Sequence, residues 1–159
     1  MRVAVLTVSS SRAGGGPDES GDALERFARE LGGEVAAREI VADEPQQIEE
    51  RLRRYADVDR CDLVLTTGGT GVAPRDLTPE ATRAVIDREV PGIAEALREA
   101  SKPHTRNWML SRGIAGIRSR TLIVNFPGNP RSIAQTSGAI AAALPHALEL
   151  IADEPTRHA

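Results

Sequence analysis

The hydrophobic residues of this chain form short continuous runs, and between the runs they recur at helical spacing. Runs with few polar positions lie at residues 3–8, 35–41 and 63–66, and two β-like pieces cover 114–118 and 121–126. Unbroken apolar runs of this length are typical of strands buried on both faces of a parallel sheet. We expect the piece at 114–118 to pair antiparallel at an edge.

Helical spacing follows most of these runs. Leu24, Phe27, Ala28 and Leu31 lie on one helical face, and Gly32-Gly33 is expected to end that helix. A second helix is expected from Pro45, with Asp43 to Gln46 as a capping box, and a third from Thr78 to Asp87, with Thr78 as N-cap. A further helix is expected from Gly92 to Ala100. The last is expected to begin at Pro130 and to be interrupted or restarted at Pro145.

The alternation of strands and helices predicts an α/β fold. We expect a three-layer α/β/α sandwich, with a mostly parallel sheet, right-handed crossovers and one short antiparallel edge strand. Residues 1–153 are expected to form a single domain, followed by a frayed tail at 154–159. Ligands bind such sheets beyond the carboxyl ends of the strands, and this rule selects the loops at 9–20, 42–46, 66–78 and 125–131.

The composition excludes several classes of function. A net charge of −3, a pI near 5.7 and 3 % aromatic residues argue against a nucleic-acid partner. Cys61 is the only cysteine, and its place before a buried strand favours a packed residue over a nucleophile. Met1-Arg2 leads directly into a strand and no apolar run approaches membrane length, so we expect a cytoplasmic protein with no membrane partner.

Charge is unevenly distributed along the chain. Between Glu99 and Glu149 there is no Asp or Glu, yet several Lys and Arg residues lie there. We call this segment the cationic third. It has two interpretations: its basic residues lie on a solvated face or an interface, or some of them neutralise an anionic ligand. Its basic residues include Lys102, Arg106, Arg112, Arg118, Arg120 and Arg131.

The turn after the third strand is the strongest candidate for a binding site. Its sequence, Gly68-Gly69-Thr70-Gly71, follows Thr66-Thr67 and precedes a helix start. Glycines allow consecutive backbone amides to point into one concavity, so the turn predicts an anion site, although a tight connection without a ligand has the same parts. The spacing matches neither a Walker A loop nor a dinucleotide fingerprint.

Two carboxylates follow adjacent strands. Asp76 lies in the loop after the glycine turn and Asp43 follows the second strand. Either residue by itself could be a turn or helix cap. Together beside a phosphate site they would suit Mg²⁺, which takes few protein carboxylates and completes its shell with phosphate oxygens and water.

The remaining candidates are weaker. Ser9 to Ser11 are expected to donate hydrogen bonds rather than to act as nucleophiles, because no Ser/His/Asp arrangement accompanies them. The turn Pro127-Gly128-Asn129-Pro130 is either a helix start or a second wall of the same crevice.

These motifs together resemble the MoaB/Mog family of molybdenum cofactor biosynthesis, over essentially the whole chain. Glu19 stands where that family commonly has a lysine. The matching pieces are Val-Leu-Thr-Val-Ser at 5–9, Asp18 to Gly21, Asp43-Glu44, Leu65 to Gly71, Arg75 to Glu80, Ser111-Arg112 and Pro127 to Ser132.

The resemblance implies an enzyme that transfers AMP from Mg-ATP to the terminal phosphate of molybdopterin and releases pyrophosphate. It implies catalytic and Mg²⁺-binding roles for Asp43 and Asp76. It also implies a homo-oligomer, trimeric or hexameric, which passes its product to a molybdenum insertase. The residues it places around the substrates are Ser9, Thr67, Gly68, Gly69, Thr70, Gly71, Ser111, Pro127, Gly128 and Asn129.

Two other functions fit the same motifs. One is a module that binds molybdopterin without chemistry, as in part of the MoaB branch. The other is a competence-related enzyme that acts on nucleotide phosphates without a pterin. Release of pyrophosphate from ATP only when molybdopterin is present would separate the three.

Overall fold

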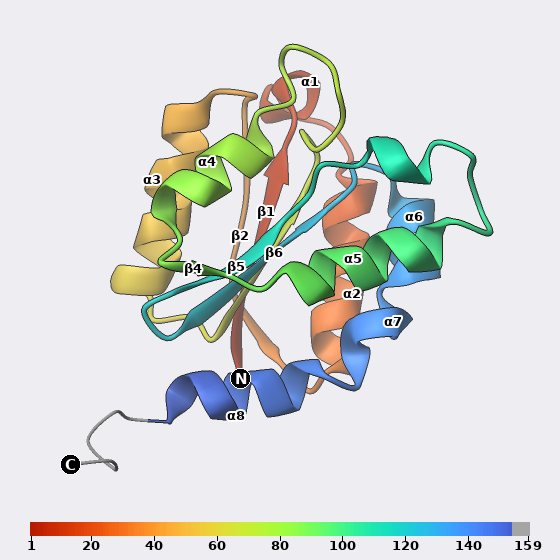
Figure 1. Cartoon of the computed structure of the whole chain (residues 1–159). Coiled ribbons are helices and arrows are strands. Elements are labelled where there is room, and N and C mark those ends of the chain that lie inside the picture. Colours follow the sequence, from red (N-terminus) through yellow and green to blue (C-terminus); the bar gives the residue numbers. More distant parts are fainter. Residues whose placement is uncertain (154–159) are drawn as a thin grey trace.

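The computed structural model describes residues 1–153, which build one six-stranded sheet between two layers of helices (Figure 1). The strand order is β2-β1-β3-β6-β5-β4. The expected three-layer α/β/α fold is therefore confirmed, whereas the frayed tail predicted at 154–159 lies outside the described residues. The strands are β1 (Arg2–Val8), β2 (Glu34–Val41), β3 (Leu63–Thr67), β4 (Arg88–Glu89), β5 (Ala115–Arg118) and β6 (Thr121–Phe126).

The antiparallel part of the sheet is larger than the sequence predicted. Strands β2, β1, β3 and β6 pair in parallel, while β5 pairs antiparallel with β6 as expected. The edge is formed by the two-residue strand β4, which pairs antiparallel with β5. The hydrophobic pattern could not predict β4, because Arg88 and Glu89 are both exposed and polar.

The sheet separates two apolar cores. Alternate residues of β1 point to opposite faces, with Val3 and Val5 in one core and Ala4 and Leu6 in the other. The first core is covered by α2, α5, α6, α7 and α8, and the second by α3 and α4 (Figure 1). The helices are α1 (Ser10–Ala13), α2 (Glu19–Glu30), α3 (Pro45–Asp57), α4 (Thr78–Val85), α5 (Pro91–Ser101), α6 (Pro130–Thr136), α7 (Gly138–Ala141) and α8 (Leu144–Ala152), with a 3₁₀ turn η1 at Trp108–Leu110.

The strand order reverses between β1 and β3. From β1 the chain crosses through α2 to β2 on one side, and returns through α3 to β3 on the other. The loops that follow β1 and β3 therefore diverge from each other and leave a crevice at the carboxyl edge of the sheet. Among the described residues, no helix is both long enough and apolar enough to span a membrane.

Two of the predicted helix caps were wrong, for the same physical reason. Thr78 is the first residue of α4, after the N-cap Leu77, and its hydroxyl donates to the carbonyl of Gly68 at 2.8 Å. The N-cap of α3 is Glu44, with no side-chain capping bond, and Asp43 bonds Ser10 instead. Neither polar side chain caps its helix, because Asp43 joins two loops at the crevice and Thr78 closes the loop between β3 and α4.

Candidate functional site

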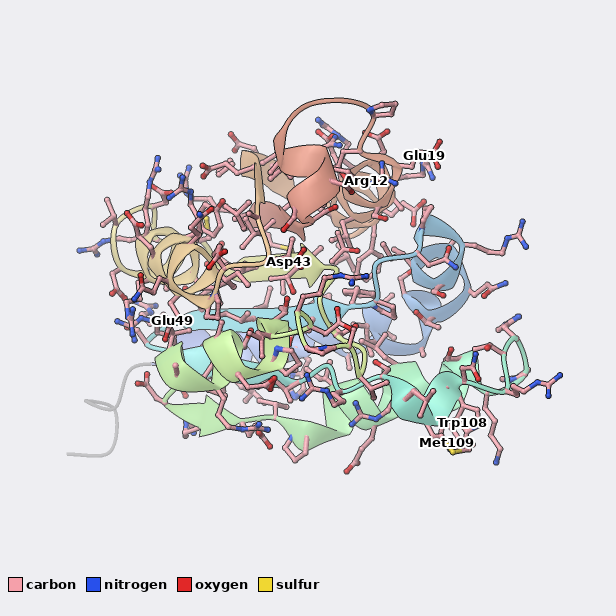
Figure 2. All side chains as sticks on the ribbon, turned by 90° about the horizontal axis from the view of Figure 1, so that it is seen from above. Arg12, Glu19, Asp43, Glu49, Trp108 and Met109 are labelled. Atoms are coloured by element: carbon pink, nitrogen blue, oxygen red, sulfur yellow. The ribbon has the colours of Figure 1, made fainter. Side chains whose placement is uncertain are left out.

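A cavity of about 420 Å³ opens at the carboxyl edge of the sheet, at the strand-order reversal. All four loops selected from the sequence contribute to its wall, and two of its residues are carboxylates. Figure 2 looks down on this edge, with Asp43 near the centre of the view and Trp108 toward its margin. The lining residues are Thr7, Val8, Ser9, Ser10, Ser11, Arg12, Ser20, Asp43, Thr67, Gly68, Gly69, Arg75, Asp76 and Gly128.

The glycine turn after β3 forms the floor of this cavity. Gly68 and Gly69 have φ of 95° and 68°, in the left-handed region that favours glycine. A Cβ on Gly68 would lie 2.2 Å from the carbonyl oxygen of Val8, so the turn packs directly on the end of β1. The N–H of Gly68 donates to the carbonyl of Phe126 at 3.2 Å. This amide therefore holds β6 and does not point freely toward an anion.

Asp43 joins the loop after β2 to the loop after β1. The backbone N–H and the hydroxyl of Ser10 both donate to Oδ2 of Asp43, at 3.0 and 2.9 Å. The N–H of Asp43 in turn donates to the Ser10 hydroxyl at 3.0 Å. These bonds hold the carboxylate at the cavity wall, where it is half-buried.

Asp76 enters the cavity from the loop between the glycine turn and α4. Its Oδ2 accepts from the N–H of Ala73 at 3.0 Å, and its own N–H donates to the carbonyl of Ala73 at 2.9 Å. The carboxylate is thus folded over its own turn and half-buried at the cavity wall. Asp43 and Asp76 line the same cavity as expected, but the prediction that they follow adjacent strands was wrong, because β1 lies between β2 and β3.

The loop after β6 closes the cavity on a third side. The Thr67 hydroxyl donates to the carbonyl of Pro127 at 2.7 Å, and the Ser20 hydroxyl donates to that of Gly128 at 3.0 Å. The side chain of Asn129 instead caps α6, by accepting from the N–H of Arg131 at 2.9 Å. The turn is therefore both a helix start and a wall, with Gly128 as its contribution to the cavity.

Five of the residues expected around the substrates do not line this cavity. Thr70 is buried, Gly71 accepts a hydrogen bond from Arg112, and Asn129 is the helix cap just described. Ser111 and Pro127 face a separate hollow of about 20 Å³ beside Trp108. The structure thus brings Ser9, Asp43, Thr67, Gly68, Gly69, Asp76 and Gly128 together, and leaves Thr70, Gly71, Ser111, Pro127 and Asn129 outside.

Two guanidinium groups in the cavity were not among the predicted site residues. Arg12 comes from α1 and Arg75 from the loop that carries Asp76. Both lie in loops that the carboxyl-end rule had selected, so their positions could have signalled a role. Among the described residues, the cationic third contributes no lysine or arginine to this cavity.

The carboxylates suit a metal that arrives with a substrate. Among residues 1–153, no group of three or more His, Cys, Asp or Glu side chains could hold a metal ion. Mg²⁺ does not need such a group, because it binds through one or two carboxylates together with phosphates and water. The donor set of Asp43 and Asp76 therefore fits Mg²⁺ that takes its remaining ligands from phosphate oxygens and water.

A second cavity, of about 500 Å³, lies at the opposite end of the strands, next to the amino ends of β3 and β6. Its wall includes Arg60, Cys61 and Arg120, which precede β3 and β6. Burial raises the pKa of Cys61 to about 11, so its thiol is protonated at neutral pH, as its buried position led us to expect. This cavity lies away from the carboxyl ends of the strands, where this fold class binds ligands, and there is no glycine among the described residues that line it.

Comparison with known proteins identifies relatives along nearly the whole chain. The family described as "Probable molybdopterin binding domain" matches residues 4–146. The molybdopterin biosynthesis enzyme MoaB from Thermus thermophilus superposes with a TM-score of 0.89 at 48% identity, covering 97% of this chain and 98% of that one.

Curated relatives carry the name molybdopterin adenylyltransferase. The Helicobacter pylori (strain J99) protein is 48% identical over 113 residues, which are 71% of this chain and 64% of that protein. The Escherichia coli (strain K12) protein is 41% identical over 140 residues, which are 86% of this chain and 71% of that protein. The chain thus spans slightly less than two thirds of the H. pylori relative.

Proposed function

The chain belongs to the family of probable molybdopterin-binding domains, and from this premise we propose that it is a molybdopterin adenylyltransferase. It would transfer AMP from ATP to the terminal phosphate of molybdopterin, with release of pyrophosphate. The observation that carries the proposal is the cavity at the strand-order reversal, which Asp43 and Asp76 line together with Gly68 and Gly69. The names of the relatives from H. pylori and E. coli support the same activity.

The geometry suits a displacement that depends on positioning. In an in-line transfer, an oxygen of the molybdopterin phosphate attacks the α-phosphorus of ATP, and pyrophosphate leaves from the opposite side. Such a reaction needs two phosphate groups held in line more than it needs a strong base. The cavity wall provides hydroxyl groups from Ser9 and Ser11 for that purpose, whereas the Ser10 hydroxyl is already donated to Asp43.

Charge in the cavity is balanced in a way that suits this reaction. Arg12 and Arg75 would attract the phosphates, and Asp43 and Asp76 would hold Mg²⁺ that enters with ATP. When bound, Mg²⁺ would neutralise the negative charge that develops on the phosphate oxygens. The protein's own contribution is to fix the two carboxylates, through Ser10 and through the Ala73–Asp76 turn.

The remaining parts of the proposal rest on the family. We assign Ser111, Pro127 and Asn129 to the pterin side of the site, next to the cavity rather than in it. We also propose that the domain, residues 1–153, works as a trimer or hexamer in the cytoplasm and passes adenylylated molybdopterin to a molybdenum insertase.

A transfer assay tests the proposal directly. The purified protein is incubated with molybdopterin and Mg-ATP, and both pyrophosphate and adenylylated pterin are measured. We expect both products in equal amounts, and neither product without the pterin. Tight molybdopterin binding without pyrophosphate would indicate the binding-only module, and pyrophosphate without pterin would indicate a nucleotide-phosphate enzyme.

A further inference from the structure

Arg112 is hydrogen-bonded to both ends of the loop that carries Asp76. We call residues 70–76 the Asp76 loop. At the start of this loop, the backbone N–H of Arg112 donates to the carbonyl of Thr70 and its Nε donates to that of Gly71, both at 2.7 Å. At the end of the loop, Nη2 donates to the carbonyl of Asp76 at 2.6 Å. One residue, 36 positions away in sequence, thus bridges the first and last peptide groups of the loop.

Glu80 fixes the plane of that guanidinium group. Its two carboxylate oxygens accept from Nη1 and Nη2 of Arg112, at 3.0 and 2.9 Å. A hydrogen bond from Arg112 lowers the pKa of Glu80, and the same bond raises the pKa of Arg112. Glu80 is in the first turn of α4, so the guanidinium is held against a regular element.

Most N–H donors of the Arg112 guanidinium group are used in hydrogen bonds to other residues of the protein. A guanidinium has five N–H donors. The bonds to Gly71, Asp76 and Glu80 occupy four of them in this structure. An arginine that bound a phosphate as a two-pronged donor would have to give up some of these bonds. Arg112 is therefore placed to hold the loop and not to hold a substrate.

The other hydrogen bonds of this segment among the described residues are local, and they include those by which Thr78 closes the base of the loop on the carbonyls of Gly68 and Gly69. Asp76 and Ala73 bond only across their own turn, which fixes the turn but not its place over the cavity. A Cβ on Gly71 would lie 2.9 Å from Oδ2 of Asp76, so the start of the loop also passes close to the carboxylate. In the part of the chain that the structure describes, Arg112 is therefore the hydrogen-bonding partner that ties residues 70–76 to a segment outside the connection between β3 and α4.

We propose that Arg112 is a positioning residue of the transfer site. With Glu80 it holds the ends of the Asp76 loop, and so places the carboxylate of Asp76 and the side chain of Arg75 at the cavity without touching substrate. The consequence for AMP transfer rests on the proposed function, whereas the restraint on the loop is a property of the free protein.

Hydrogen exchange and kinetics of three variants test this inference. Arg112→Ala removes the side-chain hydrogen bonds of Arg112. Arg112→Lys keeps the positive charge, but its ammonium group cannot reach two carbonyls and a carboxylate in one plane. Arg83→Ala is the matched control. Arg83 is also on α4, and it donates from Nε and Nη2 to the exposed Glu89 at 3.2 and 2.6 Å. The control therefore also removes an exposed two-pronged ion pair, and its hydrogen bonds go to Glu89 and not to the Asp76 loop.

We expect Arg112→Ala to raise the exchange rate of the Ala73 and Asp76 amides by about tenfold or more, with the rest of the sheet unchanged. We expect kcat to fall by about tenfold or more while KM for molybdopterin changes by less than about twofold. Arg112→Lys should recover less than half of the loss, and Arg83→Ala should match the unmodified protein. If Arg112→Ala does not fold, Glu80→Gln supplies the same exchange comparison.

Unchanged exchange in the Asp76 loop of a folded Arg112→Ala protein would overturn the proposal. A raised KM for molybdopterin with unchanged kcat would also overturn it, because the guanidinium would then be a substrate contact. If the unmodified protein transfers no AMP, the proposed function fails, and the exchange measurement alone decides whether Arg112 restrains the loop.

Discussion

Ser10 and Asp43 are joined by three reciprocal hydrogen bonds, although 33 positions separate them in sequence. The Ser10 hydroxyl donates to the carboxylate and accepts from the Asp43 N–H, so the two loops that follow β1 and β2 are joined at the cavity wall. The two hydrogen bonds that Ser10 donates both end on Oδ2 of Asp43, and they thereby set the orientation of the carboxylate. Two separate contributions of Asp43, its charge and its orientation, can therefore be tested separately.

Asp43→Asn removes the charge but keeps an oxygen that can accept from Ser10. We expect AMP transfer to fall by about 100-fold or more, because charge stabilisation at the phosphates is worth several kcal/mol. Ser10→Ala keeps the charge of Asp43 and removes the two bonds of the Ser10 hydroxyl, so that only the backbone N–H still orients the carboxylate, and it should reduce transfer by about tenfold. Glu44→Gln, on the exposed neighbouring residue, is the control and should leave the rate unchanged. Equal rates for Asp43→Asn and the control would contradict the assigned role.

Asp76→Asn should abolish AMP transfer while the protein remains folded. The carboxamide oxygen can still accept from the N–H of Ala73, so the turn is retained and only the charge is lost. Molybdopterin binding, measured by calorimetry, should stay within about threefold of the unmodified protein, since a carboxylate that holds Mg²⁺ contributes to the transition state more than to pterin binding. Near-normal turnover of this variant would show that Asp76 has no catalytic role.

Arg75→Ala should weaken binding of the phosphate-bearing substrates. Its exposed side chain lines the cavity, where a guanidinium attracts phosphate at long range. We expect KM for ATP to rise by about tenfold, which is about 1.4 kcal/mol of binding free energy. The difference between the variant and the unmodified protein should shrink as salt is added, because added ions screen this attraction. A difference independent of salt would point to a structural effect instead.

Gly68→Ala should destabilise the fold by about 2–4 kcal/mol, since it combines a positive φ with a backbone collision. Its Cβ would lie 2.2 Å from the carbonyl oxygen of Val8, and backbone cannot move as an exposed side chain does. Gly14→Ala is the control, because nothing lies within 4 Å of a Cβ there and φ is −83°. Urea unfolding of both variants gives the comparison, and equal midpoints would refute the packing argument.

The Glu80–Arg112 pair should make stability depend on pH in the acid range. The hydrogen bond from Arg112 holds the pKa of Glu80 in the folded protein below its usual range, so its stabilisation is fully present above the pKa of the unfolded chain. It is lost as pH falls through the folded pKa. Between about pH 5 and pH 3, Arg112→Ala should therefore lose less stability than the unmodified protein. Parallel pH profiles from urea unfolding would show that the pair contributes nothing to folding.

The location of the site was predictable from the sequence for a specific reason. Continuous apolar runs identify parallel strands, and the carboxyl ends of parallel strands meet at one edge. Asp43, Asp76 and Gly68 each follow such a run, so their meeting at one cavity could be expected before any contact was known. The edge strand β4 has no such signal, because a two-residue strand with exposed side chains leaves no hydrophobic pattern.

The partners of the charged residues could not be predicted in this way. In the sequence, the cationic third contains no acidic residue. In the fold, Arg118 bonds Asp57 at 2.7 Å and Arg112 bonds Glu80 at 2.9 Å, both acids from outside that segment. The tertiary structure therefore compensates part of the charge of this segment with acids from elsewhere, and the cations that line the cavity are Arg12 and Arg75.

The sequence by itself determined the α/β class, the buried strands and the edge of the sheet where the candidate cavity lies. These follow from local periodicity and from the parallel direction of the strands, which neighbouring residues encode. Only the tertiary structure decided that Asp43 bonds Ser10 and that Arg112 holds the Asp76 loop. Such bonds join segments more than 30 residues apart, and they depend on distances and angles that no local pattern contains.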